Sequence, residues 1–97
     1  MPIYVGLMKL TEQGAKDIKN APERVKNAIK ASEAAGGKNI GFYVTMGEYD
    51  YVVISEQPSD EAAMLQLAGL ASNGLVKTKT LKAFTLDEFE EIVKKLP

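Results

Sequence analysis

The sequence predicts an α+β fold in which four antiparallel strands form one sheet and helices connect or follow them. Two observations predict this fold. Apolar residues repeat every second residue in four short runs and at helical spacing in three longer segments, and the two patterns alternate along the chain. Only four residues, Gly47–Asp50, separate the second and third strand-like runs, and so short a connection makes that pair antiparallel.

Residues Pro2–Leu10 alternate as a strand that is apolar on both faces. The turn-like segment Thr11–Gly14 follows, and residues Asn20–Ala35 then carry apolar groups at helical spacing. Asn20 and Glu23 have the spacing of a capping box. We therefore expect the side chain of Asn20 to cap this helix.

A β-hairpin is expected next, formed by strands over Asn39–Met46 and Tyr51–Glu56. A second helix then begins at its N-cap Ser59 and ends at Asn73–Gly74. The central part of this helix, Ala62–Ala71, is apolar nearly all round, unlike an ordinary surface helix. We expect a further layer to cover its outer side.

The fourth strand is expected over Leu75–Phe84, and its three lysines are typical of a sheet edge that discourages further strand addition. Alternation places Lys77 and Lys79 on one face and Lys82 on the other. A second capping-box pattern, beginning at Thr85, starts the last helix.

The resulting βαββαβ order with a C-terminal helix is that of ferredoxin-like folds, in which the crossover helices cover one sheet face. We expect the helices to cover Ile3, Val5, Leu7, Val52 and Ile54. The other set would lie open on a single chain: Tyr4, Met8, Leu10, Tyr43, Tyr51 and Val53. Because an exposed apolar patch of this kind marks an interaction surface, we infer a homodimer that associates through the sheet face not covered by helices.

Composition limits both the size of the fold and its chemistry. The chain has 97 residues, 45% of them apolar and 26% charged, which suits one soluble globular domain over residues 1–97. His and Cys are absent, which excludes imidazole bases, thiolate nucleophiles and the zinc or iron–sulfur sites that those residues build. We expect no metal site and no cofactor, so any chemistry would rest on Tyr, Lys, Asp or Glu.

Charge and hydropathy argue against nucleic acid and membranes as partners. The net charge is -1 and the pI is near 5.4, so the basic excess that phosphate binding requires is missing. The longest uncharged run, between Glu61 and Lys77, is shorter than the ~20 apolar residues of a spanning helix. The first residues lack the features of a secretory signal, so we expect a cytoplasmic protein.

Several segments together resemble one protein family in order and spacing. They are Gly47, Tyr49 and Asp50 within Gly47–Ile54, with Leu10–Gly14, Pro22–Arg24, Pro58–Ala63 and Thr78–Phe84. The chain resembles the GYD family, small proteins placed in the dimeric α/β-barrel superfamily. The resemblance implies a barrel formed by the sheets of two chains. It implies no particular activity, because the superfamily includes cofactor-free monooxygenases, lactone isomerases, haem-dependent enzymes and effector domains of transcription regulators.

The candidate ligand-binding residues are tyrosines and one aspartate. Tyr4, Tyr43 and Tyr51 belong to one expected face, where an apolar surface with a few polar tips suits a small-molecule pocket or a subunit interface. Asp50, beside Tyr49, would be either a general base or an acceptor of backbone hydrogen bonds at the turn.

Three functions are compatible with these residues. The first is a homodimeric module that holds a small, partly apolar molecule, or nothing, between its two sheets. The alternative is a cofactor-independent monooxygenase or isomerase that uses the tyrosines or Asp50 on an activated substrate. The third is a structural protein that binds a partner and encloses no cavity.

Overall fold

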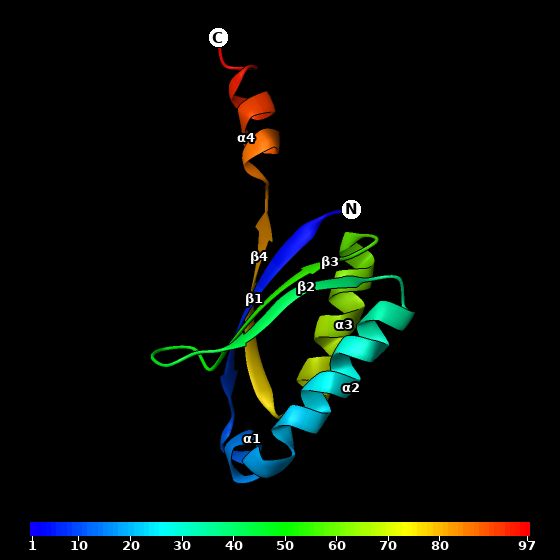
Figure 1. Ribbon diagram of the computed structural model, residues 1–97, viewed down its shortest axis with the longest axis vertical. Coiled ribbons are helices and arrows are strands. Elements are labelled where there is room, and N and C mark those ends of the chain that lie inside the picture. The colour runs from blue at the N-terminus through cyan, green and yellow to red at the C-terminus, as the bar shows by residue number, and fades with distance from the viewer.

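The computed structural model describes residues 1–97 and has the expected order of strands and helices (Figure 1). The strands are β1 (Ile3–Leu10), β2 (Lys38–Val44), β3 (Tyr51–Glu56) and β4 (Val76–Ala83). The helices are α1 (Glu12–Lys16), α2 (Ala21–Ala34), α3 (Asp60–Asn73) and α4 (Leu86–Val93), with a short 3-10 turn, η1 (Ile18–Asn20), before α2. All pairs in the four-stranded sheet are antiparallel, so the predicted α+β, ferredoxin-like fold class is confirmed.

The strand order is β2-β3-β1-β4, which makes β2 and β4 the edges of the sheet. The prediction of an edge strand that carries lysines is therefore confirmed for β4. Leu7 lies opposite Lys79, whereas Tyr4 lies opposite Lys82. Because Tyr4 and Leu7 have opposite parity on β1, Lys79 and Lys82 lie on different faces, as predicted.

Helices α2 and α3 cover one face of the sheet (Figure 1), and the sequence analysis assigned the two faces the wrong way round for every residue except Tyr43. Tyr4 and Tyr51 are on the covered face, with exposed fractions of only 8% and 6%. The face opposite, which we call the open sheet face, carries Ile3, Val5, Leu7, Tyr43, Val52, Ile54 and Leu81. Alternation separates each strand into two sets, but it does not say which set meets the helices when both are apolar.

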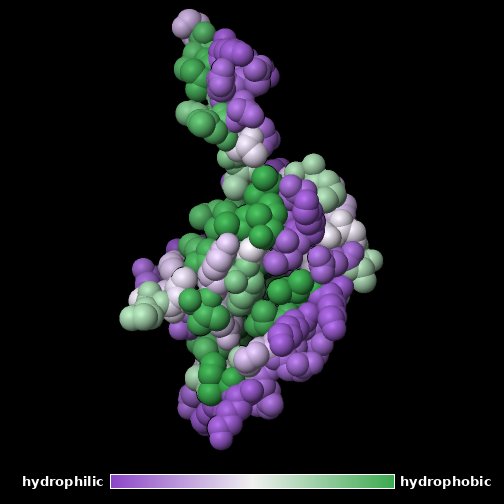
Figure 2. Space-filling model, viewed as in Figure 1, coloured by the Kyte–Doolittle hydropathy of each residue, from purple (hydrophilic) through white to green (hydrophobic).

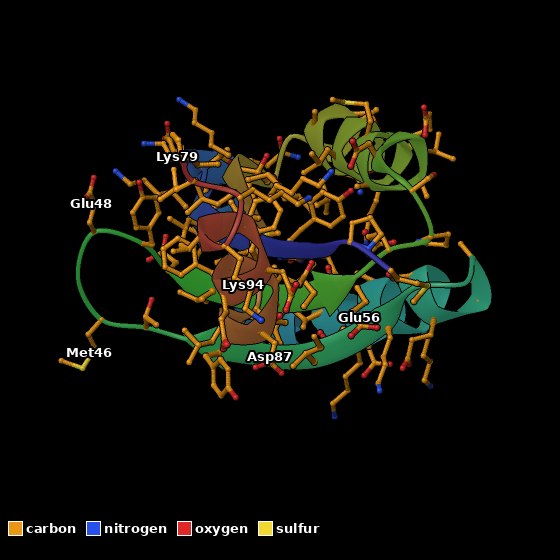
Figure 3. All side chains as sticks on the ribbon, turned by 90° about the horizontal axis from the view of Figure 1, so that it is seen from above. Met46, Glu48, Glu56, Lys79, Asp87 and Lys94 are labelled. Atoms are coloured by element: carbon orange, nitrogen blue, oxygen red, sulfur yellow. The ribbon has the colours of Figure 1, made fainter.

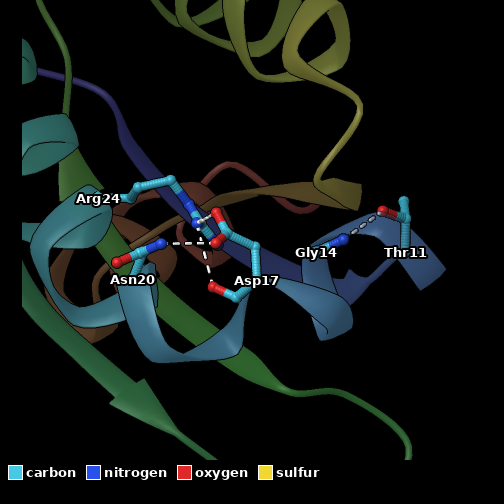
Figure 4. Close-up of polar contacts among 5 residues, drawn as sticks. All are labelled: Thr11, Gly14, Asp17, Asn20 and Arg24. Atoms are coloured by element: carbon cyan, nitrogen blue, oxygen red, sulfur yellow. Dashed lines mark hydrogen bonds and ion pairs between the residues drawn. The ribbon is translucent and has the colours of Figure 1, made fainter.

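The start of α2 also differs from the prediction. Asn20 precedes the helix, but its side chain makes no capping hydrogen bond to the backbone. Its amide instead donates to the carboxylate of Asp17 at 2.6 Å, and the guanidinium of Arg24 donates to the same carboxylate (Figure 4). The predicted capping box is therefore wrong. The side chain of Asn20 binds the carboxylate of Asp17 instead of the backbone of the first turn.

The segment expected to be a turn after β1 is the short helix α1. The hydroxyl of Thr11 accepts a hydrogen bond from the backbone N–H of Gly14 at 3.1 Å, which caps the first turn (Figure 4). Gly14 is buried, and a Cβ placed on it would lie 2.2 Å from the carbonyl oxygen of Leu75. Close packing of α1 against the chain before β4 therefore requires glycine at this position.

The other helix boundaries follow the sequence signals. Ser59 caps α3 by accepting from the N–H of Ala62 at 3.1 Å, and Gly74 ends it with a left-handed φ of 69°. Thr85 and Glu88 form the predicted capping box of α4. None of the helices has the length and hydropathy needed to cross a lipid bilayer.

Strand β2 is shorter than predicted and contains an irregularity. Its pairing with β3 shifts between Asn39 and Gly41, which leaves Ile40 as the extra residue of a bulge. Phe42 beyond the bulge lies opposite Val53 and therefore faces the helices. The strict alternation expected for this strand fails because a bulge changes the parity of every residue that precedes it.

Helix α4 extends away from the sheet and from α2 and α3 (Figure 1). The longest extent of the chain is 53 Å. The radius of gyration of the Cα atoms is 14.9 Å, against about 12.5 Å for a compact chain of this length. A single chain therefore does not bury α4.

The contact at Gly14 predicts a sharp loss of stability in the Gly14→Ala variant. A methyl group there meets a backbone oxygen that has no room to move, so we expect the free energy of unfolding to fall by at least about 2 kcal/mol. Urea denaturation followed by circular dichroism measures this change.

Gly69→Ala provides a matched control for the same substitution. A Cβ on Gly69, inside α3, meets nothing within 4 Å, and alanine is a better helix former by about 1 kcal/mol. This variant should be as stable as the parent or more stable. Equal stability of the Gly14→Ala variant and the parent would contradict the packing described for α1.

Candidate functional site

A cavity of about 180 Å³ lies between the covered face of the sheet and helices α2 and α3. We call it the helix–sheet cavity. All four strands contribute to its floor, and the two helices supply its walls. The chain holds no larger apolar core, because only Tyr4, Ala21, Tyr51 and Ala63 are buried apolar residues. The cavity therefore occupies the place where a more closely packed domain has its core.

Most of the cavity surface is apolar. The rings of Phe42 and Tyr51 lie with their centroids 5.1 Å apart at an angle of 48°, a tilted arrangement that aromatic pairs favour. The remaining apolar side chains come from the sheet and from the inner sides of both helices: Met8, Val53, Val25, Ile29, Leu67 and Leu70. Such a surface favours an apolar guest over water.

Polar side chains gather in one part of the cavity, around the carboxamide of Gln57. Gln57 is only 4% exposed, and its Nε2, which carries two hydrogens, lies within hydrogen-bonding distance of three acceptors: the hydroxyl of Ser32 at 3.3 Å, the hydroxyl of Ser55 at 3.3 Å and the Oε1 of Gln66 at 3.0 Å. These partners belong to α2, β3 and α3, so one buried amide connects both helices to the sheet. We call this group the Gln57 cluster.

Beside this cluster, Tyr4 connects β1 to the first turn of α3. Its hydroxyl donates a hydrogen bond to the carboxylate of Asp60, and the Nζ of Lys82 lies 3.2 and 3.3 Å from the two oxygens of that carboxylate. The hydrogen bond to Asp60, burial of the phenol and the negative charges of Asp60 and Glu61 together raise the pKa of Tyr4 to about 12. The hydrogen bonds from Tyr4 and Lys82 lower the pKa of Asp60. At neutral pH, Tyr4 is therefore a donor and Asp60 an acceptor.

Of the five candidate residues, the structure brings only Tyr4 and Tyr51 to the helix–sheet cavity. Tyr43 lies opposite Val52, on the open sheet face, with an exposed fraction of 59%. Tyr49 and Asp50 lie at the base of the long β2–β3 loop, whose tip carries Met46 and Glu48 and projects beyond the sheet (Figure 3). The candidates are therefore divided among three places.

Asp50 is tied to the backbone of β1. Its carboxylate accepts from the N–H of Leu10 at 2.8 Å, and its own N–H donates to the carbonyl of Met8 at 2.8 Å. Tyr49 is half-buried, and the ammonium of Lys9 lies 5.4 Å from its ring centroid. These contacts anchor the loop to the end of β1.

Sequence reasoning missed Ser32, Gln57 and Gln66 as polar residues of the cavity. Ser32 sits on the apolar side of its helix, and Gln66 interrupts an otherwise apolar segment. A polar residue at an apolar position is the signal that points to them, because a buried polar side chain needs partners.

Three apolar surfaces remain exposed on the single chain. Figure 2 shows hydrophobic side chains over the sheet and along one side of α4. The α4 stripe consists of Leu86, Phe89, Ile92, Val93 and Leu96, all of them exposed. On α3, Met64 and Leu65 are also exposed, so nothing within this chain covers the outer side of that helix.

Comparison with known proteins identifies the family. The profile of the GYD domain matches residues 4–93. The chain belongs to the GYD domain family. Three of the residues that carried the resemblance, Gly47, Tyr49 and Asp50, lie in the β2–β3 loop of this GYD domain and not in its cavity.

One curated relative of this GYD domain comes from Thermus thermophilus. It is named "Glutamine synthetase and cystathionine beta-lyase binding protein" and is 34% identical over 84 residues, which cover 86% of this chain and 88% of the relative. Among solved structures, a mutant of MhuD with two manganese protoporphyrin IX molecules per active site is similar at a TM-score of 0.47 and 15% identity. That likeness covers 89% of this chain and 95% of MhuD.

The contact between Tyr4 and Asp60 predicts an unusually weak phenolic acid. In the Asp60→Asn variant, the pKa of Tyr4 should fall from about 12 toward 10.0, because the carboxylate charge and a strong acceptor are removed. Carbon-13 NMR of the tyrosine ring carbons follows each phenol separately during a pH titration. An unchanged pKa of Tyr4 in the variant would contradict the assignment.

The same contact predicts how stability depends on pH. The folded-state pKa of Tyr4 is raised, so its stabilising contribution is complete below pH 10.0 and is lost as the pH rises toward about 12. The folded-state pKa of Asp60 is lowered from 3.8, so its contribution is present above that pH and is lost as the pH falls through the lowered pKa. Chemical denaturation at a series of pH values measures the free energy of unfolding. In the parent, this free energy should fall both at high pH and at low pH. In the double variant Tyr4→Phe, Asp60→Asn, the contributions of these two residues to both falls should be absent.

Proposed function

We propose that this GYD domain is a homodimeric protein-binding module whose subunits associate through the open sheet face. The observation that carries the proposal is the accessible surface of the single chain, 6911 Å². A folded monomer of 10.5 kDa exposes only about 5,400 Å². Each chain therefore exposes roughly 1,500 Å² more than a self-sufficient domain of its size.

This excess has the size of a subunit interface. Stable complexes of standard size bury about 800 Å² per partner, and obligate homodimers bury more. The excess is also apolar in character, because it includes the open sheet face and the α4 stripe. Association of two chains would bring the exposed surface of each one close to that of an ordinary folded protein.

The geometry of the sheet favours face-to-face association over pairing at its edge. A face of Val5, Leu7, Val52 and Ile54 can pack against its own copy about a two-fold axis, as in closed homodimers. The exposed edge strand β4 carries several lysines, which oppose the addition of another strand. We therefore assign the subunit interface to the open sheet face, with Tyr43 within it.

A surface for another protein remains on the opposite side of the molecule. Met64 and Leu65 are 63% and 76% exposed on α3, which lies on the far side of the sheet from the proposed interface. The Thermus thermophilus relative is named for its binding of two enzymes. We propose that this GYD domain also binds an enzyme, through the outer side of α3.

The alternative of a cofactor-independent monooxygenase or isomerase has less support. The carboxylate of Asp50 accepts a hydrogen bond from the N–H of Leu10 and so anchors the loop, and the raised pKa of Tyr4 keeps its phenol protonated, so Tyr4 is not a base near neutral pH. The cavity is a specific observation that favours a ligand, but it lies between helices and sheet. The ligand expected between two sheets therefore gains no support from it.

The dimer proposal predicts that the protein sediments with about twice the mass of the 10.5 kDa chain at micromolar concentration. A Val52→Lys variant should weaken the dimer at least about a hundredfold, because each interface would bury two unpaired ammonium groups. Analytical ultracentrifugation measures both states. Ala31→Lys, on the exposed side of α2, is the matched control and should remain dimeric. A parent protein that is monomeric would overturn the proposal.

The protein-binding proposal predicts binding to glutamine synthetase or cystathionine beta-lyase from the same source. Leu65→Lys should reduce that affinity at least about tenfold, since it places a charge on the apolar surface of α3, while leaving the dimer intact. Biolayer interferometry with the purified enzymes measures the affinity. Lack of binding to both enzymes, or equal binding by the variant, would contradict this part of the proposal.

A further inference from the structure

We infer that the helix–sheet cavity binds a small uncharged aromatic molecule that carries one hydrogen-bond-accepting oxygen. The inference is independent of the protein-binding function proposed above. The cavity lies on the covered face of the sheet, whereas the proposed subunit interface lies on the open face. Dimerisation through the open face would therefore leave the cavity accessible.

The volume of the cavity sets the size of the guest. A cavity of about 180 Å³ is available, and an apolar cavity of about 150 Å³ is known to hold one benzene ring. One six-membered ring with a short substituent therefore fits.

The lining favours an aromatic guest. The tilted pair of Phe42 and Tyr51 forms part of the wall, and a third ring can add to it in an edge-to-face or offset arrangement. Met8 lies on the same face of the sheet, and its flexible thioether can adjust to the edge of a ring. The remaining apolar wall comes from aliphatic side chains, which make no demand on the polarity of the guest.

The Gln57 cluster sets the polar requirement. Ser32, Ser55 and Gln66 all offer acceptor oxygens to the Nε2 of Gln57, which leaves the hydroxyl hydrogens of the two serines and the Nε2 of Gln66 without a partner in the chain. All three residues line the cavity. A guest with a carbonyl or ether oxygen at this end would accept from these donors, whereas a guest with only donors would not.

Charge complementarity argues against an anionic guest. Arg24 is the only charged side chain in the lining, and its guanidinium is already paired with the carboxylate of Asp17 and also donates to the Asp17 carbonyl at 3.2 Å (Figure 4). A carboxylate in the cavity would therefore lose its hydration without gaining a free cation. The guest is accordingly neutral.

The inference is tested with three probes of similar size on the full chain: acetophenone, ethylbenzene and benzoate. We expect acetophenone to shift the amide NMR signals of cavity residues and to raise the melting temperature, since a ligand of the folded state stabilises it. Benzoate should bind at least about tenfold more weakly than acetophenone, because its charge is desolvated. Ethylbenzene, which lacks the oxygen, serves as the reference for the polar contact.

Variants separate the polar contact from the apolar one. Ser55→Ala should weaken acetophenone about fivefold, the usual effect of one neutral hydrogen bond, and leave ethylbenzene unchanged. Ala63→Leu and Leu67→Phe fill the cavity from α3 and should abolish binding of both probes. Ala68→Leu, on the exposed side of α3, is the matched control and should bind both probes as the parent does.

Two results would overturn the inference. One is the absence of shifts in cavity residues at saturating acetophenone in a protein that the control variants show to be folded. The other is a folded Ala63→Leu or Leu67→Phe variant that binds acetophenone as tightly as the parent does, because acetophenone would then bind outside the cavity. Loss of acetophenone and ethylbenzene together in Ser55→Ala would overturn the role of the accepting oxygen.

Discussion

The sheet of this GYD domain is apolar on both faces, but the chain provides helices for only one of them. The exposed α4 stripe, the extended shape and the surface excess all follow from this imbalance. Burial of apolar area is the main favourable term in folding, at about 25 cal/mol per Å². A chain that leaves one sheet face without a covering layer buries less apolar area and gives up part of that term. The second face is therefore the surface that we propose a second copy of the chain covers, about a two-fold axis.

The covered face is held by polar contacts as much as by apolar packing. Gln57 connects α2, α3 and β3, and the Tyr4–Asp60 contact connects β1 to the first turn of α3. Buried hydrogen-bond networks fix one arrangement because any shift leaves a polar group without a partner. These contacts hold the helices at a set distance from the sheet, and Phe42, Met8 and Leu67 do not fill the space that remains. The cavity is therefore a consequence of how the helices are anchored.

Element order and most helix ends could be predicted because they depend on local chemistry. Ser59 and Thr85 cap their helices through neighbours a few residues away, and Gly74 adopts a left-handed φ that its sequence position requires. The choice of covered face could not be predicted, since it depends on contacts such as Tyr4 with Asp60, which are 56 residues apart. Asn20 failed as a cap because its amide donates to the carboxylate of Asp17, which also accepts from Arg24. The candidate site was divided in the same way: Tyr4 and Tyr51 reached the cavity, while Tyr43, beyond the bulge in β2, did not.

Strand β3 connects the two faces of the molecule. Val52 and Ile54 point to the proposed interface, while Tyr51, Val53 and Ser55 alternate with them and face the cavity. A side chain cannot move on one face of a strand without moving the backbone that carries its neighbours on the other. A dimer that fixes the position of β3 therefore also fixes the cavity floor and the Ser55 hydroxyl. Binding free energies are reciprocal, so a guest that favours one position of β3 favours the dimer built on that position by the same factor. The proposed self-association and the proposed ligand binding would thus be coupled through the two faces of one sheet.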